Sequence, residues 1–387
     1  MKKIKAFPDI DIRNWGRKPS SDSILQSENF HFYSSGRAAV YFMARAISGG
    51  QRKTAYLPVF HCGVEVEAFL RAGFEVKFYN INENFDVDFG SSSKCEFMPG
   101  DVFFIIHYFG FPQNMDKITA FCRDRQLILV EDCAHGLYSR CGGRLLGTFG
   151  EWAVFSMRKT LALPNGGGLL RRDTSLPCPE SGKRVFNPLV IKSGIRSVLE
   201  FEINTGSFWG ICAKFLVDAY SWCFPSTSEC SSDTSDKKQS SSVDVIPTFY
   251  DDTRFAYDLD IGRVSQFLLH PMPFADIVSL RRKNYQSLGK RLSQLKNIKP
   301  MFPELEEGVC PLCYPVWVSS SDWWVDQLKK RGVEAFVFGR HHHRILGESD
   351  AKRMEKMRTC ILGLPVHQML SEKEIEELVE RIGDTLP

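Results

Sequence analysis

The chain has 387 residues, with 49 lysines and arginines against 46 aspartates and glutamates, which leaves a formal net charge of +3. Its apolar content of 43% and charged content of 25% are ordinary for a globular protein, and its length predicts about two domains. No concentrated basic block accompanies the small positive charge, so nucleic acid is not an expected partner.

The amino-terminal segment and the cysteines indicate a reducing compartment. The start, MKKIKAFPDIDI, lacks the apolar stretch of a signal peptide, and no run of about 18 uncharged apolar residues follows. Twelve cysteines are scattered along the chain. We therefore expect a cytoplasmic protein without a transmembrane span.

Two short motifs have ligand types that bind metals. Cys310 and Cys313 have a zinc-like spacing, but no second pair or paired histidines follow at the usual distance. The three consecutive histidines that begin at His341 diverge on either a helix or a strand, so they seldom share one ion. No metal site is expected.

Between about residue 34 and residue 172, apolar strands alternate with short helices. We expect strands over residues 54–60, 75–81, 101–110 and 127–135, and helices over 65–73 and 116–125. Strands that are apolar throughout and separated by helices indicate a parallel sheet covered on both faces. The predicted class is α/β, with a mainly parallel central sheet sandwiched by helices.

The middle of the chain changes character. Residues 208–224 favour an amphipathic helix that packs on the protein, with binding at a membrane surface as the alternative. Residues 226–244 are rich in serine and charge, which predicts a mobile loop or linker.

Helices with one intervening strand are expected near the carboxyl end. The helices are predicted over residues 274–295, 322–332 and 371–382, and the strand over 313–320. Ser371 and Glu374 give the last helix a capping box. We predict a large α/β domain over residues 1–255 and a smaller α+β domain over 256–387.

Lys159 raises the functional question. It follows an expected strand at residues 153–155 and precedes three glycines, in surroundings with little polar surface to solvate an ammonium group. A surface lysine and a desolvated, reactive lysine are both compatible with this context.

Other polar residues stand where expected strands end or a helix begins, which is where open parallel sheets bind ligands. They are Ser35 and Gly36, Glu131, Asp132 and His135, and Ser156. Taken singly, an aspartate after a strand is often a helix cap, and Ser-Gly is often only a helix start. Together with Lys159 they meet the needs of pyridoxal 5′-phosphate (PLP): a lysine for a Schiff base, a carboxylate that keeps the ring nitrogen protonated, and a helix start for the phosphate.

The order and spacing of these residues resemble the DegT/DnrJ/EryC1/StrS family of PLP-dependent sugar aminotransferases, which have fold type I. The resemblance rests on SGRAAVYFMARAI, HYFGFPQNMDKI, VEDCAHG, GGRLLGTFGEWAVFS and LGLPVHQMLSEKEIEELVERI. It implies an enzyme that moves an amino group from an amino acid, usually glutamate, to a nucleotide-linked keto sugar, for amino-sugar or surface polysaccharide synthesis. It also implies a homodimer with each active site at the subunit boundary.

The resemblance also implies roles for single residues. Lys159 and Asp132 match the catalytic lysine and the carboxylate on the ring nitrogen, and His135 stands near the ring hydroxyl. Ser156, Gly36 and Arg37 fall where the family binds the phosphate. Cys62 stands where the family has the aromatic residue that covers the ring, so Phe60 or His61 is the expected stacking partner.

This sequence departs from the family pattern at several points. The spacing from Ser156 to Lys159 is two residues shorter than the commonest one, and Arg37 stands where threonine is commoner. The Asn-Tyr-Arg type of segment through which a second subunit reaches the phosphate is not visible. Arg340 and His341 are the candidates for substrate binding. Two alternatives stay open: a lyase or dehydratase on the same scaffold, and a PLP-binding regulator without catalysis.

Overall fold

The computed structural model describes residues 2–11, 24–92, 95–184, 188–205, 257–269, 274–295 and 298–385. Its centre is a seven-stranded sheet in the order β1-β9-β8-β5-β4-β2-β3. The strands are β1 (Phe30–Tyr33), β2 (Thr54–Pro58), β3 (Glu75–Tyr79), β4 (Val102–Ile106), β5 (Ile128–Asp132), β8 (Trp152–Phe155) and β9 (Gly167–Arg171). The run from β8 to β3 is parallel, whereas β9 is antiparallel to both β8 and β1. The predicted α/β class with a mainly parallel sheet is confirmed.

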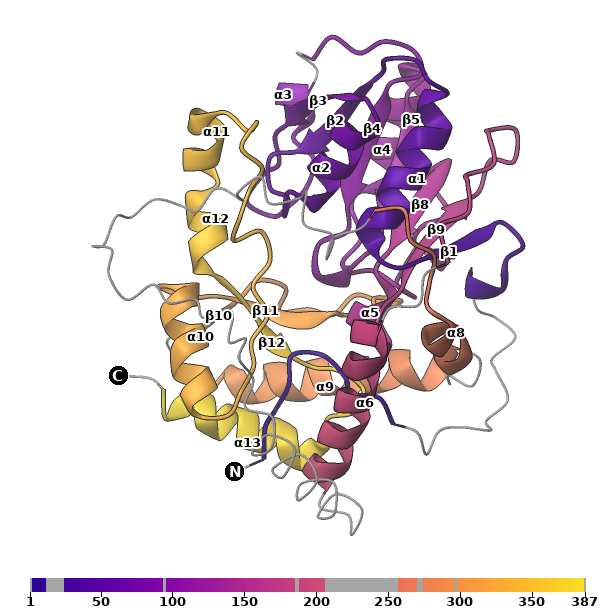
Figure 1. The fold of residues 1–387 in the computed structure, drawn as a ribbon. Helices are drawn as coiled ribbons and strands as arrows, with labels where there is room; N and C mark the ends of the chain where they lie inside the picture. Colours follow the sequence, from indigo (N-terminus) through magenta and orange to yellow (C-terminus); the bar gives the residue numbers. More distant parts are fainter. Residues whose placement is uncertain are drawn as a thin grey trace, which may run out of the picture.

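The sheet is buried because its strands are apolar on both faces. All five residues of β4, VFFII, are buried, as expected for a parallel strand covered on either side. The expected strands form with shorter bounds, since their last residues turn into loops at the carboxyl edge. The helices between them are α1 (Gly36–Ser48), α2 (Val64–Arg71), α3 (Phe89–Ser92) and α4 (Met115–Asp124). Figure 1 shows these elements together in the upper part of the molecule.

Several short elements precede, connect or follow these strands. They are the 3₁₀ turns η2 (Ile24–Gln26) and η3 (Tyr108–Gly110), the hairpin of β6 (Arg140–Cys141) and β7 (Arg144–Leu145), and the helices α5 (Met157–Thr160), α6 (Pro188–Thr205) and α8 (Arg263–Leu269). Gly167 on β9 has a specific reason to be glycine. A Cβ atom there would lie 2.0 Å from the carbonyl oxygen of Ser35, so the bare backbone lets the start of α1 approach the strand.

The carboxyl-terminal part forms a second unit below the sheet (Figure 1). An antiparallel sheet of β10 (Lys299–Pro300), β11 (Cys313–Trp317) and β12 (Ile361–Pro365) is surrounded by α9 (Phe274–Leu292), α10 (Ser321–Lys330), α11 (Glu348–Arg353), α12 (Glu355–Cys360) and α13 (Glu372–Gly383). The expected helices and the strand at β11 are confirmed, and Ser371 and Glu374 form the capping box. The start of the chain joins this unit through a bridge from Ile4 to Val333.

Some expectations fall outside the described residues. They concern the amphipathic helix at 208–224 and the serine-rich segment at 226–244. The boundary between the two predicted domains near residue 255 stays a prediction. Among the described residues, no helix is both long and apolar enough to span a membrane.

Candidate active site

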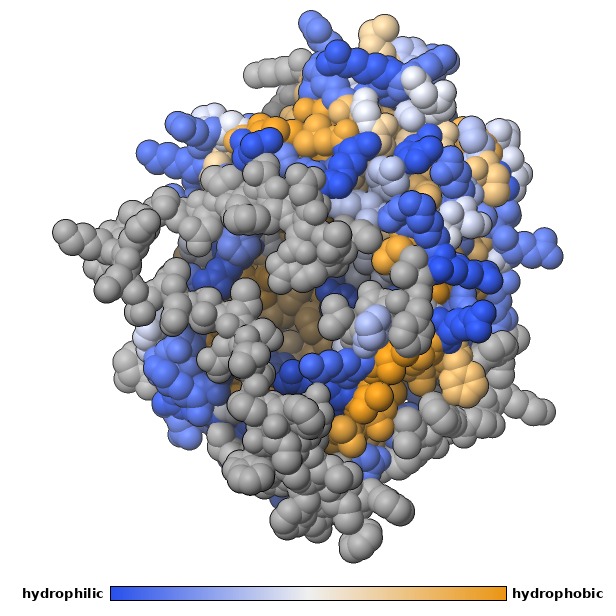
Figure 2. Space-filling view, viewed as in Figure 1, coloured by the Kyte–Doolittle hydropathy of each residue, from blue (hydrophilic) through white to orange (hydrophobic). Residues whose placement is uncertain are grey.

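A pocket of about 220 Å³ opens at the carboxyl edge of the central sheet. It is lined by Ser35, Gly36, Arg37, Val40, Cys62, Val64, Glu65, Ile106, Asp132, Ala134, His135, Val154, Phe155, Ser156, Arg158, Lys159 and Phe338. Parallel strands bring their carboxyl ends to one edge, so β4, β5 and β8 deliver their last residues to the same place. In Figure 2, hydrophobic surface lies recessed between hydrophilic side chains near the centre of the face shown.

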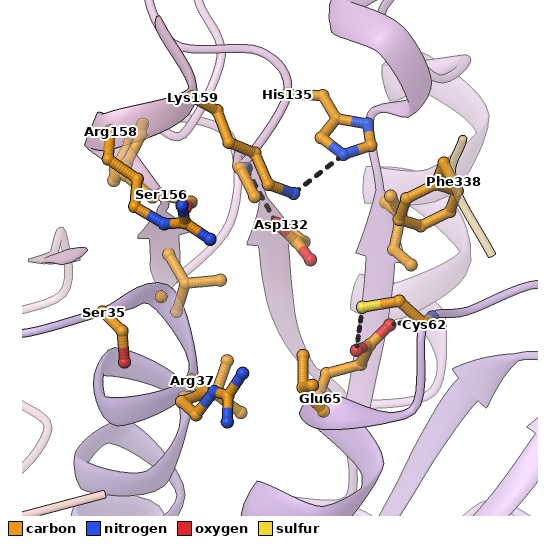
Figure 3. Close-up of a pocket in the computed structure, with 17 residues that line it drawn as sticks. Ser35, Arg37, Cys62, Glu65, Asp132, His135, Ser156, Arg158, Lys159 and Phe338 are labelled. Carbon is orange, nitrogen blue, oxygen red and sulfur yellow. Dashed lines mark hydrogen bonds between the residues drawn. The ribbon is translucent and has the colours of Figure 1, made fainter. Parts of the chain in front are cut away.

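Lys159 projects into this pocket from the short helix α5, and its Nζ atom lies 3.0 Å from Nε2 of His135 (Figure 3). The backbone N–H of Phe109 donates to His135 Nδ1 at 3.2 Å, which leaves the ring proton on Nε2. The ring proton of His135 can therefore be donated to Nζ when the lysine is a neutral amine. Burial lowers the pKa of Lys159, and burial together with the lysine charge lowers the pKa of His135.

Asp132 ends β5 and lies near the lysine in the same pocket. Burial, and next the nearby carboxylate of Glu65, raise the pKa of Asp132 to about 7, while the N–H of Ala134 and the charge of Lys159 act in the opposite direction. The backbone N–H of Ala134 donates to Asp132 Oδ1 at 2.8 Å. This carboxyl group is therefore balanced between its two protonation states, and a cation placed against it would favour the charged form.

The start of α1 forms another wall of the pocket. Ser35 caps the helix by accepting a hydrogen bond from the N–H of Ala38, and the N–H groups of Gly36 and Arg37 precede that capped donor in the first turn. A Cβ atom on Gly36 would lie 3.3 Å from Cβ of Ser156, so the helix start and the end of β8 are in close contact. The N–H groups and the dipole at the start of a 13-residue helix favour a bound anion.

Opposite this wall lie Cys62 and Glu65. The backbone N–H of Cys62 donates to Glu65 Oε1 at 3.0 Å, and its thiol donates to Oε2 at 2.9 Å. Burial raises the pKa of the Cys62 thiol, and the adjacent carboxylate adds to this effect, so the thiol is neutral. Sequence reasoning missed Glu65, although a glutamate between Val64 and Val66 at a helix start was a visible signal of a buried carboxylate.

The structure does not bring Phe60 and His61 to the pocket wall, contrary to the expectation that one of them stacks on a ring there. Both are fully buried. His61 stacks on Phe78 with ring centroids 5.1 Å apart, and Phe60 packs against Phe338 at 5.4 Å. The backbone carbonyl of His61 accepts a hydrogen bond from Arg358, and that of Phe60 accepts one from the Tyr108 hydroxyl. These contacts hold the backbone so that both side chains point into the core. Phe338, which sequence reasoning missed, lines the pocket instead.

Arg340 and His341 also lie apart from the lining residues. Arg340 forms an ion pair with Asp322 at 2.7 Å, and both side chains are largely exposed. The carbonyl of His341 accepts a hydrogen bond from Arg358. The other six predicted residues, Gly36, Arg37, Asp132, His135, Ser156 and Lys159, line one pocket.

One buried cluster has ligand types that bind metals. Single donor atoms of His107, Glu131 and Cys133 lie within 4.8 Å of one another. His107 Nδ1 accepts from the N–H of Gln113, which leaves Nε2 to donate to Glu131 at 3.1 Å. Glu131 also accepts three backbone N–H groups from residues 147–150. The hydrogen bonds of His107 and Glu131 brace the loop before β8, which favours a structural role for these two residues.

Residues 93–177 match the DegT/DnrJ/EryC1/StrS aminotransferase family. The matched segment contains Asp132, His135, Ser156 and Lys159, and all four residues line the pocket.

Curated relatives match parts of the chain. GDP-perosamine synthase of Escherichia coli O157:H7 is 34% identical over 73 residues, which cover 18% of this chain and 20% of that protein. The dTDP-4-dehydro-2,3,6-trideoxy-D-glucose 4-aminotransferase of Saccharopolyspora spinosa is 26% identical over 186 residues, which cover 45% and 48%. The chain thus spans less than half the length of either relative.

Solved structures show the same fold over the whole chain. PseC of Helicobacter pylori, an aminotransferase involved in the biosynthesis of pseudoaminic acid, superposes with a TM-score of 0.64 at 14% identity, covering 100% of this chain and 99% of that one. The PLP form of Spr1654 of Streptococcus pneumoniae gives 0.63 at 14% identity, with the same coverage. The fold is therefore that of the fold-type-I sugar aminotransferases.

Proposed function

We propose that this protein is a PLP-dependent aminotransferase that moves an amino group to a keto sugar. The observation that carries the proposal is the Lys159 amine, 3.0 Å from His135 and with its pKa lowered by burial, in a pocket that also contains Asp132 and the start of α1. A neutral amine, an ionisable carboxyl group and an anion-binding helix start are the three features that PLP requires of a protein.

The residues present fit this cofactor. Lys159 would attach to its aldehyde carbon, Asp132 would face the ring nitrogen, and the N–H groups of Gly36 and Arg37 with the Ser156 hydroxyl would bind the phosphate. When bound, PLP supplies an electron sink that stabilises negative charge at the substrate carbon next to the amino group.

This chain's own groups then handle the protons. Burial lowers the pKa of Lys159, and the nearby His135 ring can donate to Nζ, so both favour the neutral amine that would accept a proton from the substrate carbon. Asp132, once ionised, holds a proton on the ring nitrogen. Phe338 and the buried wall around it limit water at the reacting atoms.

The substrates are proposed from the names of relatives. One curated relative is the dTDP-sugar 4-aminotransferase of Saccharopolyspora spinosa, and another is a UDP-N-acetyl-3-dehydro-α-D-glucosamine 3-aminotransferase of Acidithiobacillus ferrooxidans. A nucleotide-linked keto sugar is therefore our proposed acceptor, with Arg340 and His341 still predicted to contribute to its binding. We propose glutamate as donor, with glutamine as the competitor because a relative from Micromonospora echinospora is an L-glutamine:2-deoxy-scyllo-inosose aminotransferase.

We also propose a cytoplasmic homodimer. Large apolar side chains exposed on two neighbouring helices support a subunit interface: Ile195 on α6 is 57% exposed and Phe267 on α8 is 63% exposed. Figure 2 shows hydrophobic side chains gathered in that part of the surface.

Absorption spectroscopy tests the cofactor and the lysine together. Purified full-length protein with PLP should show the visible band of a lysine-linked cofactor, and glutamate should convert it. Lys159→Ala should lose the band, whereas Lys330→Ala, which removes an exposed lysine on α10, should keep it. A band that survives in Lys159→Ala would contradict the proposal.

A further inference from the structure

The pocket is divided by charge, and one side holds two arginines. In Figure 3, Arg158 and Ser156 lie on the same side of the pocket as Ser35 and Arg37, whereas Cys62 and Glu65 lie on the other. The start of α1 contributes Arg37, and α5 contributes Arg158. Two guanidinium groups, two hydroxyl groups and a helix start therefore face the same part of the cavity.

Among the described residues, no aspartate or glutamate forms an ion pair with Arg158. Burial and the charge of Arg37 lower the pKa of Arg158, yet a guanidinium group stays protonated at neutral pH. The charge of Arg37 opposes that of Arg158, and an anion placed between the two guanidinium groups would relieve this repulsion.

The local geometry of α5 separates the tasks of Arg158 and Lys159. Successive residues of a helix point about 100° apart, so adjacent side chains on α5 point toward different sides of the pocket. Lys159 faces His135, whereas Arg158 extends along another side of the pocket (Figure 3). The short spacing from Ser156 to Lys159 puts Arg158 on this same turn.

We propose that Arg158, together with Arg37, binds the phosphate of the cofactor, so that two cations of one chain neutralise its two negative charges. This inference rests on the proposed function. A phosphate dianion carries a charge of about −2 and accepts several hydrogen bonds, and arginine binds such a group through two parallel N–H donors. The two arginines supply the charge, and the serines with the helix start supply neutral donors.

The test compares PLP with pyridoxal, which has the same ring and aldehyde but no phosphate. Apoprotein of the full chain is titrated with each compound, and binding is followed by absorption and by quenching of protein fluorescence. Arg158→Gln should weaken PLP binding by about tenfold to a hundredfold, the factor expected for one lost charge-assisted hydrogen bond, and should change pyridoxal binding less than about twofold. Arg158→Lys should give an intermediate loss, because it keeps the charge without the paired donors.

Controls separate this inference from its rivals. Arg52→Gln, which alters an arginine that is 80% exposed, should leave both affinities unchanged. An equal loss for PLP and pyridoxal, or no loss for either, would overturn the role in phosphate binding. If Arg158→Gln instead weakens binding of UDP to the PLP-loaded protein and spares PLP, the arginine serves a substrate phosphate and the inference is wrong. If wild-type protein gives a band with neither PLP nor pyridoxal, the proposed function itself fails.

Discussion

Replacing Arg281 tests how the carboxyl-terminal unit holds the turn that carries Lys159. Arg281 lies on α9 and is 1% exposed. Its guanidinium group donates to the carbonyls of Pro311, Leu312 and Thr160, each at 3.1 Å, and to the Gln368 side chain at 2.8 Å. Thr160 directly follows Lys159, and Gln368 also donates to its carbonyl at 3.1 Å.

Arg281→Met keeps a side chain of similar length and removes these donors. A buried carbonyl left without a donor costs about 1–3 kcal/mol, and the removed cost of burying a charge offsets part of this loss. The Thr160 carbonyl keeps the hydrogen bond from Gln368, so the carbonyls of Pro311 and Leu312 are the ones left without this donor. We therefore expect the free energy of unfolding to fall by about 3 kcal/mol. The turn should also loosen, which would reduce the fraction of protein that attaches PLP through Lys159.

Urea unfolding measures the first effect, and the visible absorption of the PLP-loaded protein measures the second. Arg282→Met is the matched control, because Arg282 is the next residue of α9 and donates to the carbonyls of Glu306 and Val309 from a half-exposed position. Water can replace those donors, so about 1 kcal/mol or less should be lost. If Arg281→Met is as stable as Arg282→Met and attaches PLP as fully as wild type, the reasoning is refuted.

Two further predictions concern the pocket acid and the assembly. Asp132→Asn should slow the half-reaction with glutamate by more than about tenfold, or 1.4 kcal/mol of barrier, and a stopped-flow rate equal to wild type would make Asp132 a structural residue only. Burial raises the pKa of Asp132 to about 7, above the value of about 3.9 expected in the unfolded chain. The stability that Asp132 contributes to the apoprotein is therefore complete below about pH 4 and is lost as the pH rises through 7. The free energy of unfolding in urea should fall less over this pH range in Asp132→Asn than in wild type, and an equal fall would contradict the assignment. Sedimentation should show a dimer, and Ile195→Glu combined with Phe267→Glu should shift it toward monomer; a monomeric wild type would refute the interface.

The central sheet could be predicted because its strands are apolar on both faces. A short run that is apolar at every position, such as VFFII in β4, favours a strand that is buried on both faces. The strand ends were overestimated because apolar residues continue past the last pairing. Phe109 lies beyond β4 with a φ of 57°, in a turn that the apolar pattern does not reveal.

The pocket residues that could be predicted are polar or small residues that stand at the end of an expected strand or at the start of an expected helix. Asp132 ends β5, Ser156 follows β8, and Gly36 begins α1, so local order was enough to gather them. Phe338 could not be found in this way, because it reaches the pocket from a segment that is distant in sequence. Arg158 stands next to Lys159, but only the direction of its side chain shows that it faces the cavity.

The side chain that faces the pocket after β2 depends on how that strand ends, which the sequence does not reveal. Val59 and His61 have carbonyls that accept hydrogen bonds from Arg358, a fully buried side chain of α12. This contact fixes the path of the chain after β2, so Cys62 rather than His61 faces the pocket. A cation some 300 residues away in sequence has no signature near residue 60.

Two buried arginines, Arg281 and Arg358, connect the walls of the pocket in the same manner. Arg281 joins α9 to the carbonyl of Thr160, and Arg358 joins α12 to the carbonyls of Val59, His61 and Gly339, beside Phe338. Burial lowers the pKa of Arg358 to about 10, which still leaves it protonated at neutral pH, and carbonyl groups do not titrate. The frame that sets the distance between Lys159 and its opposite wall is therefore insensitive to pH near neutrality. Because burial raises the pKa of Asp132 to about 7, its ionisation, rather than a loss of these arginine–carbonyl contacts, is expected to contribute to changes in the pocket between pH 6 and 8.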